Sequence, residues 1–269
     1  MIVWLNGALM AAEAARIDPA DRGFTLGDGL FETIRGRAGR AALLDRHLGR
    51  LRHGAELLGI PVGWSDAEIA AAIERLLAAL GLADAAIRLT LTRGPAPRGV
   101  LPPAEPHPTL LLTAGPLPPP AGAARAIIAA STRRNELSPL ARVKSLNFLD
   151  NVLARREAAG RGADEALLLN TRGRLVEATI GNLFLEIGGA LVTPPVAEGA
   201  LPGVMRGRLI ECCGAVERVL DPVDLDRADA AFLSNALGLR PIDTVDGLAI
   251  GRTPGRARGL VVECLATLG

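Results

Sequence analysis

Lys144 lies in the stretch Arg142-Val143-Lys144-Ser145-Leu146-Asn147-Phe148-Leu149 and is the only lysine among the 30 Lys and Arg residues of the chain. Arginine serves in salt bridges and surface contacts at least as well as lysine, but its pKa stays above about 12. A lysine amine can lose its proton on burial, and the neutral amine can attack a carbonyl carbon. The stretch therefore predicts a lysine that forms a Schiff base with a carbonyl cofactor. The alternative is a surface lysine left by chance in an arginine-rich composition.

The composition is that of a globular protein with one large or two medium domains, since 49% of the 269 residues are hydrophobic. No apolar stretch reaches the roughly 18 residues of a membrane helix, and the first residues lack the features of a signal peptide. We therefore expect a cytoplasmic protein that does not bind membranes. A net charge of +1, 3% aromatic residues and the absence of tyrosine argue against a nucleic-acid partner.

The cysteines and histidines do not form a metal-binding pattern. Cys212 and Cys213 are adjacent and Cys264 is distant, which fits neither a disulfide framework nor a zinc site. We expect these cysteines to be small buried side chains. His47 and His53 are six residues apart and do not share a helix face, so we expect no metal.

A proline-rich segment at residues 114–123 divides the chain near its middle. Its prolines remove backbone donors and exclude a helix or a central strand. We expect a linker there, between a smaller α/β domain at 1–113 and a larger domain at 124–269 that binds the cofactor.

Hydrophobic periodicity predicts helices and strands in both domains, and hence a mixed α/β fold. Helices are expected at 44–58, 65–80, 146–160 and 204–213, the last opened by Leu201-Pro202-Gly203. Strands are expected at 87–91, 108–113, 125–132, 165–170, 175–177 and 230–234, with a hairpin at 183–193 that turns at Gly188-Gly189.

Five motifs follow one another along almost the whole chain: Asp21-Arg22-Gly23-Phe24-Thr25-Leu26-Gly27-Asp28-Gly29-Leu30-Phe31-Glu32-Thr33-Ile34-Arg35, His47-Leu48-Gly49-Arg50-Leu51, Val143-Lys144-Ser145-Leu146-Asn147-Phe148, Leu175-Val176-Glu177-Ala178-Thr179-Ile180-Gly181-Asn182, and Leu201-Pro202-Gly203-Val204-Met205-Arg206. In order and spacing they resemble the class IV aminotransferases, the fold-type IV enzymes of pyridoxal phosphate. The resemblance implies a two-domain fold like that of D-amino acid aminotransferase. It also implies a homodimer and a small-molecule amino substrate.

The same resemblance assigns roles to individual residues. Lys144 would carry the cofactor and move protons, and Glu177 would face the pyridine nitrogen of the cofactor. The phosphate would meet Arg50, the amides of Val204 and Met205 at a helix start, and the turn at Thr179 and Ile180. The loop with Asn235 and Ala236 would also touch the phosphate, although relatives commonly have a threonine where Ala236 stands.

Three reactions remain open within the family, because the pocket that separates them is poorly visible in a sequence. Aminodeoxychorismate lyases, which release pyruvate to give 4-aminobenzoate in folate biosynthesis, are similar in Phe31-Glu32-Thr33-Ile34-Arg35 and in the short loop at Ala236. D-amino acid aminotransferases are similar at Arg98, which would hold the substrate carboxylate, but Val100 replaces a histidine and Phe31 a tyrosine. Branched-chain aminotransferases typically have Phe-Glu-Gly and Gly-Thr-Ala runs that are absent here. The lyase is our leading interpretation, about even with the transaminases combined.

A hypothesis from another class is a binding protein that uses no pyridoxal phosphate, in which Lys144 and Glu177 form an ion pair. Such a protein would not be yellow when purified. The sequence leaves the substrate, its stereochemistry, the oligomeric state and the contacts that replace the threonine at Ala236 undecided.

Overall fold

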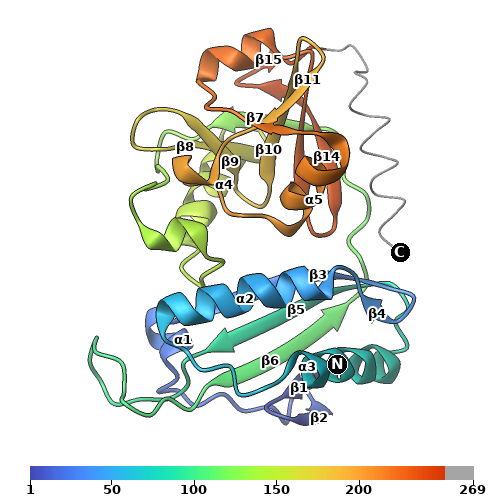
Figure 1. Ribbon diagram of the computed structural model, residues 1–269, viewed down its shortest axis with the longest axis vertical. Coiled ribbons are helices and arrows are strands. Elements are labelled where there is room, and N and C mark those ends of the chain that lie inside the picture. The colour runs from blue at the N-terminus through green and yellow to red at the C-terminus, as the bar shows by residue number, and fades with distance from the viewer. Residues whose placement is uncertain (252–269) are drawn as a thin grey trace. The chain divides into compact units, whose positions relative to one another are not determined.

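The computed structural model describes residues 1–251, and contacts within the chain divide it into two compact units (Figure 1). Within the described residues, unit 1 comprises Met1–Pro118 together with Val143–Asn147, and unit 2 comprises Pro119–Arg142 and residues 148–251. The segment around Lys144 thus groups with the first unit and not with the second domain in which the sequence placed it. The reason is a set of backbone hydrogen bonds to strand β3 (Gly29–Arg37).

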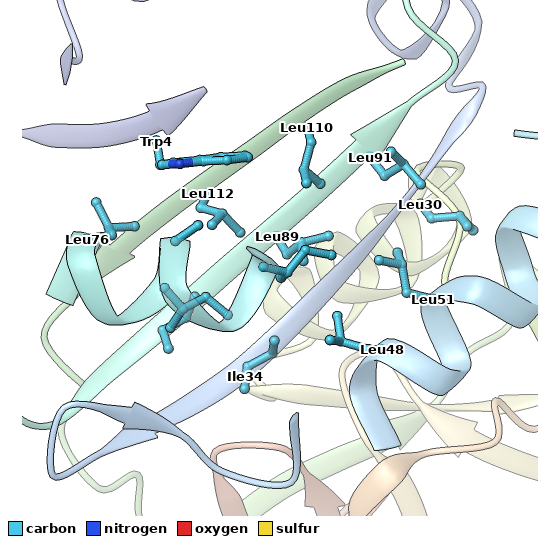
Figure 2. Packing of buried hydrophobic residues seen from close by; sticks show 14 of the residues in the cluster. Trp4, Leu30, Ile34, Leu48, Leu51, Leu76, Leu89, Leu91, Leu110 and Leu112 are labelled. Atoms are coloured by element: carbon cyan, nitrogen blue, oxygen red, sulfur yellow. The ribbon is translucent and has the colours of Figure 1, made fainter. Parts of the chain in front are cut away.

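Unit 1 contains a six-stranded antiparallel sheet with the order β2-β1-β6-β5-β3-β4. Leucines of two helices pack with leucines and isoleucines of the sheet, and Trp4 closes the edge of this core (Figure 2). The remaining elements of the unit are β1 (Ile2–Leu5), β2 (Ala8–Ala11), α1 (Arg22–Leu26), β4 (Arg40–Ala41), α2 (Leu44–Leu58), α3 (Asp66–Leu80), β5 (Ala85–Thr92) and β6 (Thr109–Gly115).

Local sequence explains the bounds of the two longer helices, which confirm the predicted ranges. Ser65 caps α3 with a capping box, because its Oγ accepts from the Glu68 amide and the Glu68 carboxylate accepts from the Ser65 amide. Gly59 and Gly81 end α2 and α3 in the left-handed conformation, with φ angles of 64° and 67°.

Unit 2 contains nine strands in the order β12-β11-β10-β13-β14-β7-β8-β9, with β15 beside β14. Glu177 of β9 pairs with Asn182 of β10, so that six of the strands (β10, β13, β14, β7, β8 and β9) form a closed ring. The elements are β7 (Ala124–Ile128), η1 (Pro139–Arg142), α4 (Leu149–Gly160), β8 (Glu165–Leu169), β9 (Leu175–Ala178), β10 (Asn182–Ile187), β11 (Ala190–Thr193), η2 (Val196–Glu198), α5 (Val204–Cys213), β12 (Val216–Glu217), η3 (Pro222–Arg227), β13 (Ala230–Asn235), β14 (Gly238–Val245) and β15 (Leu248–Ala249).

Among the predicted boundaries that differ from the structure, three have a clear physical reason. Helix α4 begins at Leu149 and not at residue 146, because Ser145 and Leu146 are extended beside β3. Strand β7 ends at Ile128 and not at residue 132, because the Ala130 and Ser131 amides bond to the Glu157 carboxylate. Strand β6 continues to Gly115, inside the expected linker, because Gly115 pairs with Ala86.

The prediction that the cysteines are buried is wrong for Cys212, which is exposed, while Cys213 is partly exposed. Cys264 lies outside the described residues. Within residues 1–251, no helix is long and apolar enough to cross a membrane. In the same part of the chain, no cluster of three or more His, Cys, Asp or Glu side chains is arranged to hold a metal ion.

Candidate active site

Lys144 is fixed beside the start of β3 in unit 1. The Phe31 amide donates to the Lys144 carbonyl at 2.9 Å, and the Leu146 amide donates to the Gly29 carbonyl at 2.9 Å. The half-buried lysine places its Nζ 4.3 Å from the centroid of the Phe31 ring, and Phe31 itself is buried. A backbone held at two points and an aromatic face beside the amine together restrict where the amine can lie.

Gly29 makes this approach of two chain segments possible. A Cβ at this position would lie 2.5 Å from the Leu91 carbonyl oxygen and 2.8 Å from Leu146 Cδ1. Any side chain would push the lysine segment away from β3 or disturb β5. The Gly27-Asp28-Gly29 turn therefore has a structural role next to the lysine.

Arg88 of β5 is a neighbour of Phe31 that the sequence did not reveal. Its guanidinium carbon lies 3.4 Å from the centroid of the Phe31 ring, a cation–π arrangement. Desolvation lowers the pKa of Arg88 to about 10, although the nearby charge of Glu32 opposes the shift. Arg88 is therefore still a cation at neutral pH. Its alternation with Ile87 and Leu89 predicted only a solvent-facing strand position, and no sequence signal marked it further.

Arg50 is bound by a carboxylate in unit 1. Its Nε and Nη2 donate to Glu32 at 2.8 and 2.6 Å, and the Glu32 side chain is only 1% exposed. His47 Nδ1 lies 2.7 Å from the second oxygen of the same carboxylate. Burial alone would raise the pKa of Glu32, but the hydrogen bonds of His47 and Arg50 and the charge of Arg50 lower it overall. The sequence identified Arg50 but missed Glu32 and His47 as its partners.

Glu177 lies in unit 2 at the point where the ring of strands closes. The Arg134 guanidinium donates twice to its Oε1, at 2.8 and 2.5 Å. Its Oε2 accepts from the Leu201 amide at 3.1 Å and from Asn182 Nδ2 at 3.4 Å. The carboxylate is thus buried among donors, and one of its contacts belongs to the segment that leads into α5.

Asn182 in unit 2 contacts the segment that leads into α5. Asn182 Nδ2 donates to the Leu201 carbonyl at 2.9 Å, and a Cβ on Gly203 would lie 2.0 Å from Asn182 Oδ1. Helix α5 has no side-chain cap, so its first amides, on Val204 and Met205, are available for an acceptor. These amides follow Leu201 along the chain, and the amide of Leu201 donates to Glu177.

The turn after β9 is joined to the turn after β13. Asn235 Nδ2 donates to the Ile180 carbonyl at 3.3 Å, and Asn235 pairs with Gly238, so that only Ala236 and Leu237 form the loop between β13 and β14. Thr179 is already engaged, because its hydroxyl bonds to Glu165 and to Arg155 Nη1 and its amide bonds to the Ala166 carbonyl. Ile180 is 52% exposed.

Arg98 stands in a different environment, on the exposed loop between β5 and β6. Arg22 holds this loop, since its Nη1 and Nη2 each donate at 2.8 Å to the carbonyls of Gly99 and Val100. The side chain of Val100 is 84% exposed. The structure thus leaves Arg98 exposed on its loop, whereas Phe31 is buried in β3.

A family model described as "Amino-transferase class IV" matches residues 29–245. The chain belongs to this family and is an enzyme, which confirms the resemblance seen in the five motifs.

Individual relatives have different activities. The chain is 36% identical over 261 residues to a Methanocaldococcus jannaschii protein with the provisional name of branched-chain-amino-acid aminotransferase, and the match covers 93% of this chain and 90% of that protein. It is 30% identical over 257 residues to D-alanine aminotransferase of Bacillus licheniformis, with the same coverage of 93% and 90%.

Solved structures confirm the fold. The 4-amino-4-deoxychorismate lyase from Pseudomonas aeruginosa superposes with a TM-score of 0.86 at 34% identity, covering 99% of each chain. A branched-chain amino acid aminotransferase in complex with N-(5'-phosphopyridoxyl)-L-glutamate superposes with a TM-score of 0.90 at 25% identity, covering 99% of this chain and 93% of that one. The mixed α/β architecture is therefore that of fold-type IV enzymes.

Proposed function

We propose that the protein is a pyridoxal-phosphate-dependent enzyme that acts on a small-molecule amino substrate through Lys144. The observation that carries the proposal is the position of the only lysine of the chain, with its backbone bonded to β3 and its amine on the face of Phe31. Support comes from the family match and from the phosphopyridoxyl ligand in the structure of the branched-chain relative. We further propose a homodimer, which analytical ultracentrifugation of the purified protein can test.

The residues present fit this cofactor. In unit 2, an uncapped helix start suits a phosphate, and a buried carboxylate lies one hydrogen bond from the segment that leads into this helix. In unit 1, Arg50 supplies a permanent positive charge that suits phosphate oxygens, with its Nε and Nη2 held by Glu32. Lys144, Arg50, Glu177, Val204 and Met205 are the residues we propose to hold the group.

The side chains would divide the chemistry among them. When bound, pyridoxal phosphate supplies an electron sink for the charge that develops on the substrate carbon as its proton leaves. Lys144 Nζ would remove that proton and return it, since a lysine with a suitably lowered pKa is a competent base. Glu177 would hold the ring nitrogen in its protonated form, and Arg134 would fix the carboxylate in place.

Our leading specific reaction is the release of pyruvate from 4-amino-4-deoxychorismate to give 4-aminobenzoate. The specific observation in its favour is the short loop of Ala236 and Leu237, which has no threonine hydroxyl for a phosphate. The P. aeruginosa lyase, 34% identical over 99% of the chain, adds support.

Transamination is the second candidate, because the M. jannaschii and B. licheniformis relatives are named for branched-chain amino acids and for D-alanine. For the D-alanine reaction, Arg98 would bind the substrate carboxylate, and Phe31 would line the substrate site. The position of Val100 where that pattern has a histidine counts against this version.

The cofactor hypothesis is tested first. The purified protein should absorb near 400 nm, lose this colour with borohydride, and then carry a reduced adduct on the peptide that contains Lys144. The variant Lys144→Arg keeps the positive charge but should lose at least about a thousandfold in turnover, because its side chain cannot become a neutral nucleophile. Full turnover in this variant, or a protein that never binds pyridoxal phosphate, would refute the proposal.

The reaction is tested with a substrate panel. Aminodeoxychorismate is supplied alone, and D-alanine or leucine is supplied with 2-oxoglutarate, while 4-aminobenzoate and glutamate are measured. Formation of 4-aminobenzoate without glutamate supports the lyase. Glutamate without 4-aminobenzoate would replace it with a transaminase, and the identity of the productive amino acid would give the stereochemistry.

A further inference from the structure

Glu32 occupies a position in β3 where packing calls for an apolar side chain. Leu30 and Ile34, two residues to either side, point to the same face of the strand and pack with Leu48 and Leu51 of α2 (Figure 2). Glu32 is 1% exposed between them. Replacing a buried ion pair with apolar residues of similar volume is often neutral or even stabilising. Stability alone therefore does not explain why a carboxylate stands at position 32.

The partners of this carboxylate come from one face of α2. His47 and Arg50 are three residues apart and therefore lie side by side on the helix. His47 Nδ1 and Arg50 Nη2 both contact Glu32 Oε2, at 2.7 and 2.6 Å, and Arg50 Nε contacts Oε1 at 2.8 Å. Two bonds fix the plane of the guanidinium, and the bond to His47 fixes the carboxylate.

We propose that Glu32 and His47 are positioning residues that hold the Arg50 guanidinium ready for the phosphate of the cofactor. This inference rests on the proposed function, in which Arg50 binds that phosphate. An arginine side chain has many rotamers and loses their entropy when it is ordered. In this arrangement the loss occurs on folding and not on cofactor binding.

Electrostatics acts in the opposite direction at Glu32. Its negative charge lies 2.6 Å from Arg50 Nη2 and reduces the attraction of the guanidinium for an anion. A neutral variant of Glu32 therefore changes orientation and charge together. His47 offers a cleaner test, because Asn and Leu have a similar shape, are both neutral, and differ in whether they can donate to Glu32.

The experiment compares two ligands on apo-protein prepared from wild type, His47→Asn and His47→Leu. Dissociation constants are measured by absorbance for pyridoxal phosphate and for pyridoxal, which has no phosphate. We expect His47→Leu to bind pyridoxal phosphate about tenfold more weakly, with pyridoxal affinity unchanged within about twofold. His47→Asn should stay within about threefold of wild type for both ligands. The ³¹P resonance of bound pyridoxal phosphate should shift in His47→Leu and not in His47→Asn.

Matched controls separate this role from general destabilisation. Arg52 lies on the same helix and is paired at 2.5 Å with Asp66, which is largely exposed, so Asp66→Asn should leave the preference for pyridoxal phosphate over pyridoxal unchanged. Glu32→Asp keeps the charge, but its shorter side chain moves the carboxylate oxygens away from Arg50 and His47. Like His47→Leu, this variant should lose the preference for pyridoxal phosphate over pyridoxal. If His47→Leu does not fold, Glu32→Asp and His47→Asn decide the question.

The outcomes distinguish this inference from the proposed function. A wild-type protein without affinity for pyridoxal phosphate would defeat both. A wild-type protein with a reducible adduct on Lys144, whose His47→Leu and Glu32→Asp variants keep the full preference for the phosphorylated ligand, would overturn the inference alone. Tighter binding of pyridoxal phosphate by Glu32→Asp would likewise overturn it and leave Glu32 as a charge that only weakens Arg50.

Discussion

The substitution Asp28→Asn should destabilise unit 1 by about 3 kcal/mol. Asp28 lies between Arg22 and Arg93, whose side chains are each only 5% exposed. Both Nε atoms donate to its Oδ2 at 2.7 Å, and Arg93 Nη2 donates to Oδ1 at 3.1 Å. The asparagine would retain the shape but leave two buried guanidinium groups without a counter-charge.

The expected loss of stability depends on the hydrogen bonds that the two arginines retain in the variant. Removing one partner of a buried ion pair typically costs about 3–5 kcal/mol. Here Arg22 still donates to the carbonyls of Gly99 and Val100, and Arg93 to those of Gly59 and Leu58, at distances of 2.6–2.8 Å. These bonds remain in the variant, and the lower end of the range is therefore expected.

Tryptophan fluorescence during urea unfolding is the appropriate assay. Both tryptophans of the chain, Trp4 and Trp64, lie in unit 1 with ring centroids 6.1 Å apart, so the signal follows this unit. The control is Glu74→Gln, which removes the partner of Arg40 at 3.6 Å in a pair whose side chains are 82% and 52% exposed. It should change the free energy of unfolding by less than about 0.5 kcal/mol.

The pH dependence gives a second check on Asp28. Burial would raise the pKa of Asp28, but the hydrogen bonds and charges of Arg93 and Arg22 lower it overall. A lowered pKa in the folded state contributes stability that is present above the unfolded pKa of about 3.9 and is lost as the pH falls through the folded value. The difference between wild type and Asp28→Asn should therefore be constant from neutral pH to about pH 5 and shrink below about pH 4. A difference under about 1 kcal/mol at pH 7, or one that persists undiminished in acid, would refute the reasoning.

Three further substitutions probe unit 2. Glu177→Gln replaces a carboxylate that Arg134 contacts twice, and turnover in steady-state assays should fall about a hundredfold while circular dichroism stays native. Gly203→Ala brings a Cβ to 2.0 Å from Asn182 Oδ1, so that Asn182 must shift, and thermal unfolding should show a loss of about 1–3 kcal/mol. Ala236→Thr supplies the hydroxyl that relatives commonly have, and equilibrium dialysis should show pyridoxal phosphate bound about threefold to tenfold more tightly; unchanged affinity would place that loop away from the phosphate.

The elements that could be predicted from the sequence are those whose signals are local. The apolar spacing of α2 and α3 predicted both ranges, and the Gly188-Gly189 turn predicted the hairpin of β10 and β11. The start of α4 could not be predicted in this way. Ser145 and Leu146 fit a helix by their own propensity, but backbone bonds to residues more than a hundred positions earlier hold them extended.

The partners of the candidate site residues could not be predicted from the sequence either. Lys144 could be named because it is the one lysine, and Arg50 and Glu177 because their motifs resemble those of the family. Glu32 and Arg88, in contrast, stand in strands that show ordinary alternation. Glu32 is an acceptor only because α2 brings His47 and Arg50 to its face of the sheet. Arg88 contacts Phe31 because the two side chains emerge from neighbouring strands, a relation set by the register in which Phe31 is opposite Thr90.

The choice between arginine and lysine follows the chemistry of each buried position. Arg22, Arg93, Arg50 and Arg134 each use at least two donors on carbonyl or carboxylate oxygens, the geometry that a rigid fork satisfies and a single ammonium does not. A permanent charge is useful at those sites, because each faces a carboxylate. At Lys144 the amine lies on an aromatic ring, with a second cation, Arg88, on the same ring. Of the two residue types only lysine can become a neutral amine near neutral pH, so the one lysine stands at the position where the proposed function requires an amine that can lose its proton.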